Sequence, residues 1–164
     1  MKRVFFAICL VLALCVSVSA FDIQYSNKYL AERNQGNIDW TTDSFKIILM
    51  DTTYTFNRDT HHSYTDVSSD ELATGYGYTQ NTKTLTLDTT SIENDTNDSS
   101  DISVVSVEWV ASGGTIGPVV GAIIFDDTVS DYVVCYIDFD GEMSVTDTNT
   151  LGIYNILFRE VSQQ

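Results

Sequence analysis

The chain has 164 residues, a length that fits one domain, and its 23 acidic side chains against 8 basic ones give a formal charge of −15. This charge excludes a protein that holds nucleic acid by neutralising phosphates, because such binding needs clustered Lys and Arg. Apolar residues make up 43% of the sequence, too many for a disordered acidic tail. With 17 Asp, 20 Thr and one Pro, the composition disfavours helices and favours strands.

Residues 1–20 have the three parts of a secretory signal peptide. The basic pair Lys2-Arg3 is followed by an apolar run to about Val16 and by small residues that end at Ala20. The apolar run is shorter than the ~20 residues that span a bilayer. We expect cleavage after Ala20, which leaves residues 21–164 as one β-rich domain without a membrane segment. An uncleaved N-terminal anchor is the alternative.

Periodicity predicts the remaining elements in chain order. Residues 22–35 are the best helix candidate, capped by Asp22 or Ser26 and ended by Gly36. Short apolar runs and alternation of period two then predict strands over residues 45–50, 84–88, 104–110, 119–125, 132–139 and 151–158. We therefore predict an all-β, mainly antiparallel domain, either a β-sandwich or a small barrel, with one short N-terminal helix.

Three residues that could carry chemistry are assigned to the core. Cys135 is the one cysteine left after cleavage, and it lies in an apolar run, so we expect a buried, unreactive thiol and no internal disulfide. Trp40 and Trp109 stand beside apolar runs, which favours packing over ligand binding.

Residues 51–78 and 91–101 are polar, and we expect both to be surface loops. The second carries weak calcium candidates, since carboxylate and amide oxygens are hard ligands. These are Asp95, Asn97, Asp98 and Asp101. A calcium loop needs Gly at its sixth position and Glu at its twelfth, where this chain has Ser100 and Ser106. A solvated loop is therefore favoured, and no metal or cofactor is predicted.

No pattern in the sequence predicts a catalytic residue. His61 and His62 are adjacent, so in an extended segment they point to opposite sides and do not share an ion. Asp138 and Asp140 flank a strand end next to Gly141, which is turn composition. We expect a protein that is not an enzyme. A possible interaction surface, which could stack on sugars, consists of Tyr54, Tyr64, Tyr76 and Tyr78.

Several segments, in this order, resemble a family of small virion structural proteins of tailed bacteriophages. The segments are residues 36–40 (Gly-Asn-Ile-Asp-Trp), 42–49, 59–61, 64–67, 84–87, 107–109, 122–125 and 136–139. Together they cover most of residues 25–140. The resemblance implies a compact β-rich, capsid-associated or decoration-type module without catalysis or cofactor, whose partners are the virion lattice or other copies of itself.

The predicted leader departs from this family, because virion proteins assemble without an export signal. Two localisations therefore stay open, the virion and the exterior of the cell. The alternative function is an exported binding domain for cell-surface or carbohydrate ligands.

Overall fold

The structure is a computed structural model that describes residues 15–18, 22–94 and 99–161. It is mostly antiparallel β-structure, with 46% strand and 12% helix, which confirms the predicted all-β class. The strands are β1 (Cys15–Val18), β2 (Asp22–Tyr25), β3 (Phe45–Asp51), β4 (Leu87–Asn94), β5 (Ser99–Val104), β6 (Val107–Val110), β7 (Ile116–Asp126), β8 (Val133–Val145), β9 (Thr150–Ile153) and β10 (Leu157–Val161). The helices are α1 (Asn27–Asn34) and α2 (Tyr64–Val67), with a 3-10 turn η1 (Ser68–Asp70).

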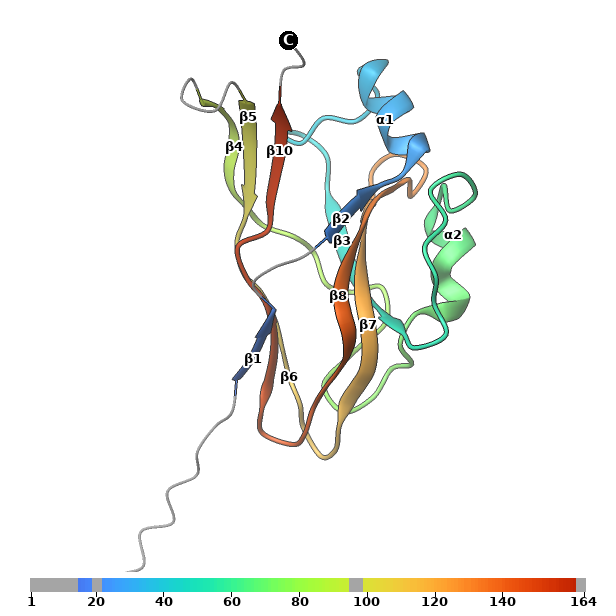
Figure 1. The fold of residues 1–164 in the computed structure, drawn as a ribbon, viewed down its shortest axis with the longest axis vertical. Helices are drawn as coiled ribbons and strands as arrows, with labels where there is room; N and C mark the ends of the chain where they lie inside the picture. The colour runs from blue at the N-terminus through green and yellow to red at the C-terminus, as the bar shows by residue number, and fades with distance from the viewer. Residues whose placement is uncertain (1–14, 19–21, 95–98, 162–164) are drawn as a thin grey trace, which may run out of the picture.

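The strands form two layers, as in a sandwich (Figure 1). One layer is a four-stranded sheet in the order β2-β8-β7-β3. The other contains two three-stranded sheets, β10-β5-β4 and β1-β9-β6, which follow one another along the molecule. The long antiparallel hairpin of β7 and β8 is the centre of the four-stranded sheet, with β3 and β2 paired on its two sides.

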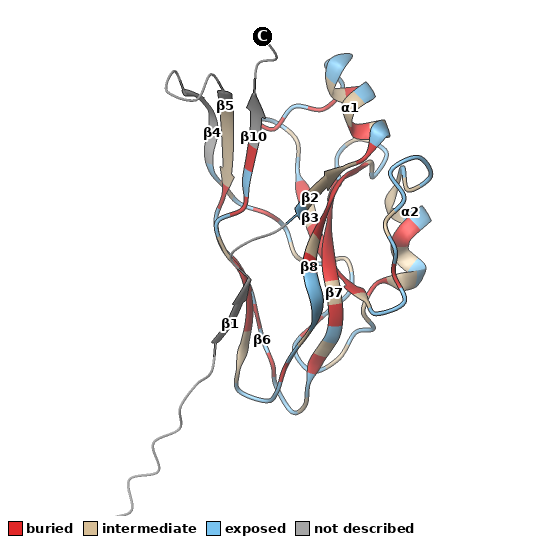
Figure 2. Cartoon of the chain, viewed as in Figure 1, coloured by how far each residue is buried: buried red, intermediate tan, exposed pale blue. Residues whose placement is uncertain are grey.

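Both faces of the four-stranded sheet are buried (Figure 2). Along β7, Ala122 and Ile124 belong to the core between the layers, while Ile123 and Phe125 belong to a second core on the outer face. This arrangement explains why β3, the second half of β7 and the first half of β8 read as continuous apolar runs, because both of their faces are buried. Trp40 and Trp109 are 7% and 5% exposed and lie in the inner core, as the sequence predicts.

The outer face of this sheet is covered by residues 51–78, which the sequence predicted as a surface loop. This segment contains α2 and η1, and Figure 1 shows it packed beside β7. Val67 is fully buried and Tyr54 is 6% exposed, and both pack on residues of β3, β7 and β8. The segment is polar on average, yet a few apolar side chains are enough to anchor it.

The helix predicted over residues 22–35 is shorter than expected. Asp22–Tyr25 is strand β2, which pairs antiparallel with β8, because Ile23 and Tyr25 alternate and pack against the inner core. The helix begins after Ser26, whose hydroxyl oxygen accepts a hydrogen bond from the Lys28 amide at 3.1 Å. Of the two predicted caps, Ser26 is the one that is used.

Three strand predictions also need correction. The predicted loop at residues 91–101 is wrong for its described part, since residues 91–94 belong to β4 and residues 99–101 to β5. The strand predicted over 104–110 is interrupted at Val105 and Ser106, and the one over 151–158 is interrupted between β9 and β10. In both cases the chain passes from one three-stranded sheet to the other, an event that a continuous apolar run does not reveal.

The predicted signal peptide falls largely outside the described residues, and its cleavage stays a prediction. Within it, Cys15–Val18 is described as β1, which pairs in parallel with β9. Among the described residues, no helix is long and apolar enough to cross a membrane. Cys135 is a free, fully buried thiol, and its burial raises its pKa.

Candidate functional site

The interruption between β5 and β6 creates a groove on the surface of the three-stranded sheets. Val105 and Ser106 leave the ladder here, although the Val105 amide still donates to the Thr86 carbonyl at 2.8 Å. On the other side of the same groove the chain crosses from β9 to β10 through residues 154–156. Two chain crossings side by side leave a hollow that strands in one continuous sheet would fill.

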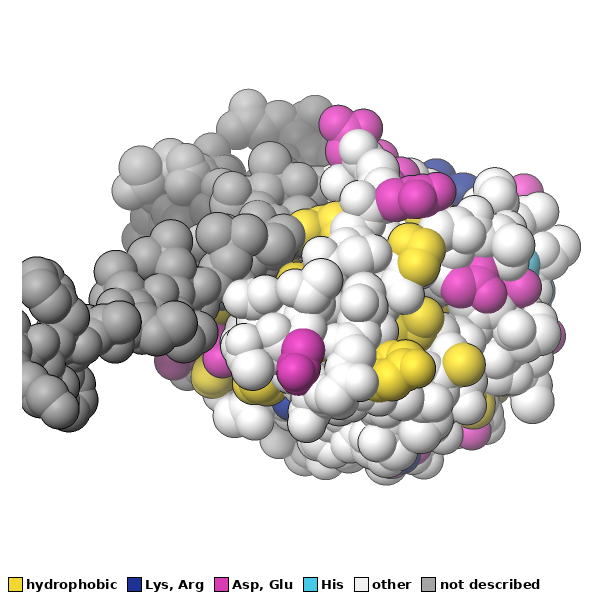
Figure 3. Space-filling model, turned by 90° about the horizontal axis from the view of Figure 1, so that it is seen from below, with side chains coloured by type: hydrophobic (Ala, Val, Ile, Leu, Met, Phe, Trp, Pro, Cys, Tyr) yellow, Lys and Arg dark blue, Asp and Glu magenta, His cyan; other side chains and the backbone are white. Residues whose placement is uncertain are grey.

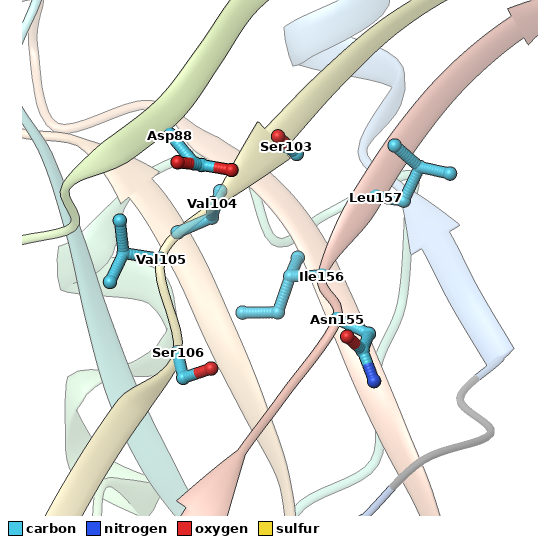
Figure 4. Close-up of a pocket in the computed structure, with 8 residues that line it drawn as sticks. All are labelled: Asp88, Ser103, Val104, Val105, Ser106, Asn155, Ile156 and Leu157. Carbon is cyan, nitrogen blue, oxygen red and sulfur yellow. The ribbon is translucent and has the colours of Figure 1, made fainter.

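The hollow has two lobes that share Val105 and Ser106, and together they form what we call the Val105 groove. The first lobe has a volume of about 370 Å³ and is lined by Asp88, residues 103–106 and residues 155–157 (Figure 4). In this view Ile156 lies between the side chains of Val105 and Leu157. The second lobe, of about 460 Å³, is lined by Lys83, Thr84, Thr86, residues 105–108 and Val110.

Large apolar side chains are exposed along this groove. Val105, Val110 and Leu157 are 44%, 57% and 39% exposed. Acidic and basic side chains lie among them. Lys83 and Glu108 line the second lobe, and Asp88 lines the first. The groove is therefore an apolar, mixed-charge region on a molecule whose surface is otherwise strongly acidic. An exposed cluster of this kind on a folded domain is typical of a contact surface.

The four tyrosines predicted as one interaction surface lie in three different places. Tyr64 and Tyr78 meet at the buried carboxylate of Glu71, to which their hydroxyls donate at 2.8 and 2.7 Å. Tyr78 is 2% exposed and its hydroxyl also accepts from the Leu49 amide at 3.0 Å. Burial, followed by the hydrogen bond to Glu71, raises the pKa of Tyr64 to about 12. The Tyr78 hydroxyl therefore links residues 51–78 to the Leu49 amide of β3, whereas the Tyr64 hydroxyl bonds within residues 51–78.

Tyr76 is the exposed member of the set. Its ring is 57% exposed and lies over Gly114, where a Cβ atom would collide with it. Figure 3 shows one end of the molecule, where apolar patches interrupt the polar surface and acidic side chains are more prominent than basic ones. The Ser112 amide donates to the Tyr76 carbonyl at 2.9 Å, which ties this residue to the turn after β6.

Tyr54 belongs to a second hollow, on the outer face of the four-stranded sheet. We call it the Tyr54 hollow; its volume is about 400 Å³ and its lining is Gln24, Tyr54, Thr55, Phe56, Val120, Tyr136, Asp138 and Gly141. The half-buried ring of Phe56 stacks on Tyr136 with centroids 5.6 Å apart. Burial raises the pKa of Tyr136 to about 12, and its hydroxyl donates to the Val120 carbonyl at 3.1 Å.

His61 packs against Tyr54, one of the residues that line the Tyr54 hollow. Its ring stacks on Tyr54 at 5.4 Å, and its Nδ1 atom lies 3.0 Å from the Tyr54 hydroxyl. The Asn57 amide donates a hydrogen bond to the same nitrogen at 3.2 Å, so Nδ1 is an acceptor. The His61 ring therefore helps to hold the turn of residues 57–61. His62 makes a different contact, since its backbone amide donates a hydrogen bond to the Asp66 carboxylate at 3.1 Å.

The calcium candidates are only partly placed by the structure. Asp95, Asn97 and Asp98 lie outside the described residues, while Asp101 is in β5 opposite Ile92 and Arg159. In the parts of the chain that are described, no three His, Cys, Asp or Glu side chains gather as metal ligands. The prediction that Asp138 and Asp140 flank a strand end is wrong, because β8 continues through both residues to Val145. Asp138 accepts a hydrogen bond from the Asp140 amide at 2.9 Å, next to the positive φ angles of Asp140 and Gly141.

Sequence reasoning missed the Val105 groove, and also Phe56 and Tyr136 as the aromatic floor of the second hollow. Val105 and Ser106 have no turn residue beside them, so the break between two strands carries no local signal. The sequence predicts Tyr136 in a strand, and the structure confirms this. Which side of the sheet its ring faces depends on the pairing of β8, which the sequence does not give. No protein-family model, curated protein or solved structure matches this chain.

Proposed function

We propose that the chain is a non-enzymatic structural module of a phage-like virion, of the capsid-associated or decoration type. The observation that carries this proposal is the Val105 groove, with its exposed Val105, Val110 and Leu157. Supporting it is the ordered resemblance of residues 25–140 to small virion proteins. The two-layered β-fold suits a protein that presents a surface, because both cores are filled by the chain's own side chains.

In this proposal the groove receives a second copy of the same chain. With a formal charge of −15, two copies repel one another over most of their surfaces. In the groove, Lys83 offers a positive charge to a second acidic copy, beside Asp88, Glu108 and exposed apolar side chains. Association at that place buries apolar area without pairing like charges, and contacts of this type have an apolar centre and a polar rim.

The test is the oligomeric state of the purified protein. Light scattering over a range of concentrations should show a trimer or a concentration-dependent lattice. Leu157→Asp should shift the protein to monomer, because a carboxylate in the groove adds repulsion where the two copies meet. Thr60→Asp, an equally exposed position on the opposite layer, is the matched control and should assemble as the parent does. A monomer at every concentration would contradict the proposal.

A second candidate is an exported domain that binds cell-surface carbohydrate, and the Tyr54 hollow favours it. Sugar rings stack on aromatic faces and bond to carboxylates and amides, and Phe56 lies here with Asp138 and Gln24. Retention on a glycan array, lost in Gln24→Ala and kept in Thr60→Asp, would support this candidate. Sequencing the N-terminus of protein recovered from the medium would show whether the leader is removed after Ala20.

A further inference from the structure

At the end of β7 the protein buries a carboxyl group without a basic partner. Asp126 has no exposed surface. Its Oδ1 atom accepts hydrogen bonds from the amides of Thr128 and Val129 at 2.8 and 3.1 Å, which shapes the turn that follows the strand. Its Oδ2 atom has no hydrogen-bond donor. A buried, ionised oxygen in this situation costs far more than a protonated one.

The turn before β3 lies beside Asp126, because Phe45 pairs with Asp126 in the sheet. Besides burial, the Asp43 carboxyl of this turn raises the pKa of Asp126 through its charge and through a side-chain hydrogen bond. Asp43 Oδ2 accepts the Asp39 amide at 2.6 Å, so this side chain is oriented by its own turn. Two ionised carboxylates that lie close together repel one another, and pairs of this kind keep one proton between them. A proton on Asp126 would remove this repulsion and give its Oδ2 atom a partner.

The backbone around the pair joins the two segments closely. The Ser44 amide donates to the Thr128 hydroxyl at 2.7 Å, and the Asp127 amide donates to the Ser44 carbonyl at 2.7 Å. Asp127 and Lys46 lie on the same two segments and form an ion pair with each other at 2.8 Å, and Asp39 lies in the turn of Asp43. Lys46 is therefore engaged with Asp127, and the Asp43–Asp126 contact has to be neutralised by other means.

We propose that Asp126 is protonated in the folded protein and donates a hydrogen bond through Oδ2 to the Asp43 carboxylate. We call this hydrogen bond the latch, because it joins the turn before β3 to the connection between β7 and β8. The latch joins two segments 83 positions apart in the chain, and it opens when the proton leaves, because the two carboxylates then repel. The protein thus carries a pH-sensitive contact at one end of its central sheet.

The direction of the pH effect follows from the environment. Burial raises the pKa of Asp126, the Asp43 carboxyl raises it further, and the Thr128 and Val129 amides act against this. A carboxyl whose pKa is higher in the folded state contributes stability below its unfolded pKa of about 3.9 and loses it as the pH rises through the folded value. The latch is therefore closed in mild acid and weakens toward neutral or alkaline pH.

The experiment is a series of thermal unfolding curves between mild acid and alkaline pH for the whole protein and three variants. Asp126→Asn keeps the Oδ1 acceptor and supplies an Nδ2 donor toward Asp43, so it imitates the protonated state. Its Tm should fall less than that of the parent as the pH rises, by several degrees. Asp43→Asn should flatten the profile in the same way. Asp140→Asn removes the same charge at an exposed position of β8 and should leave the slope of the parent.

Carboxyl-carbon NMR provides the direct readout. One carboxyl should titrate above all the others, and that signal should vanish in Asp126→Asn. The proposal is overturned if the pH profiles of Asp126→Asn and Asp43→Asn run parallel to that of the parent. It is also overturned if calcium chloride raises the Tm of the parent at alkaline pH and not that of Asp126→Asn. In that case the pair would hold a cation in place of a proton.

Discussion

Glu71 shows how single residues fasten the covering segment to the sheet. This side chain is 4% exposed and accepts hydrogen bonds from the hydroxyls of Tyr64 and Tyr78 and from the Asn81 amide at 2.8 Å. Three donors directed at one carboxylate compensate for its removal from water. Because Tyr78 also accepts from the Leu49 amide, its hydroxyl hydrogen is committed to Glu71.

Glu71→Gln should therefore destabilise the protein by about 1–3 kcal/mol, the cost of leaving a buried polar group unpaired. The new amide nitrogen is a donor that faces a tyrosine hydroxyl or a backbone amide, which are donors as well. Chemical denaturation of the variant measures the loss. Glu142→Gln, at an exposed position in β8, makes the same chemical change and should have almost no effect. Equal stability of the two variants would mean that Glu71 does not hold the segment.

At the scale of elements, the β7–β8 hairpin depends on the absence of a side chain at Gly121. This residue pairs with Asp138 at a place where the register shifts. A Cβ atom there would meet the ring of Tyr136 and lie 2.5 Å from the Ile137 carbonyl oxygen. The Tyr136 ring can move only if its stacking on Phe56 is disturbed. The Ile137 carbonyl belongs to the neighbouring strand β8, so it can move only with that strand.

Gly121→Ala should therefore cost about 1–3 kcal/mol or more, as overpacking a filled core does. Differential scanning calorimetry would record this as a lower Tm. Gly75 provides the matched control, since a Cβ atom at that position meets nothing within 4 Å. Gly75→Ala should leave the Tm near that of the parent. A tolerated alanine at position 121 would show that β7 and β8 can separate locally at little cost.

The elements also show what a sequence reveals and what it does not. The strands at residues 45–50 and 119–125 were predicted almost as they occur, because burial of both faces leaves a continuous apolar run. The strand predicted over 132–139 continues to Val145, because its second half is largely exposed and polar and carries no apolar run. The strands β4 and β5 were missed over residues 91–94 and 99–101, because segments of Thr, Ser and Asp have the composition of a loop. Its pairing with β10, far along the chain, is what makes β5 a strand.

The candidate sites were predictable to a smaller extent. Trp109 and Cys135 were assigned correctly to the core, since each lies within a buried strand. The tyrosines were not separable by sequence, because Tyr78 and Tyr76 stand two positions apart and yet one is buried and the other exposed. The contact between Asp43 and Asp126 joins two turns, and nothing in either turn alone points to the other.

For the whole molecule, the dominant physical quantity is the formal charge of −15. Among the described residues, the ion pairs of Lys28 with Glu32 and of Lys46 with Asp127 offset part of this charge locally. Repulsion among the remaining carboxylates acts against the compact state. Its range shortens from about 30 Å at 0.01 M salt to about 8 Å at 0.15 M.

Sodium chloride should therefore raise the Tm between those two ionic strengths, since screening relieves a repulsion that is stronger in the folded than in the unfolded chain. Thermal unfolding monitored by circular dichroism at constant pH measures the effect. Calcium chloride at matched ionic strength is the control, and it should raise the Tm no more than screening requires. A larger rise with calcium, lost on replacing Asp101 by Asn, would mean that the acidic segment around residues 95–101 binds the ion. A Tm that falls with sodium chloride would show that favourable ion pairs outweigh the repulsion.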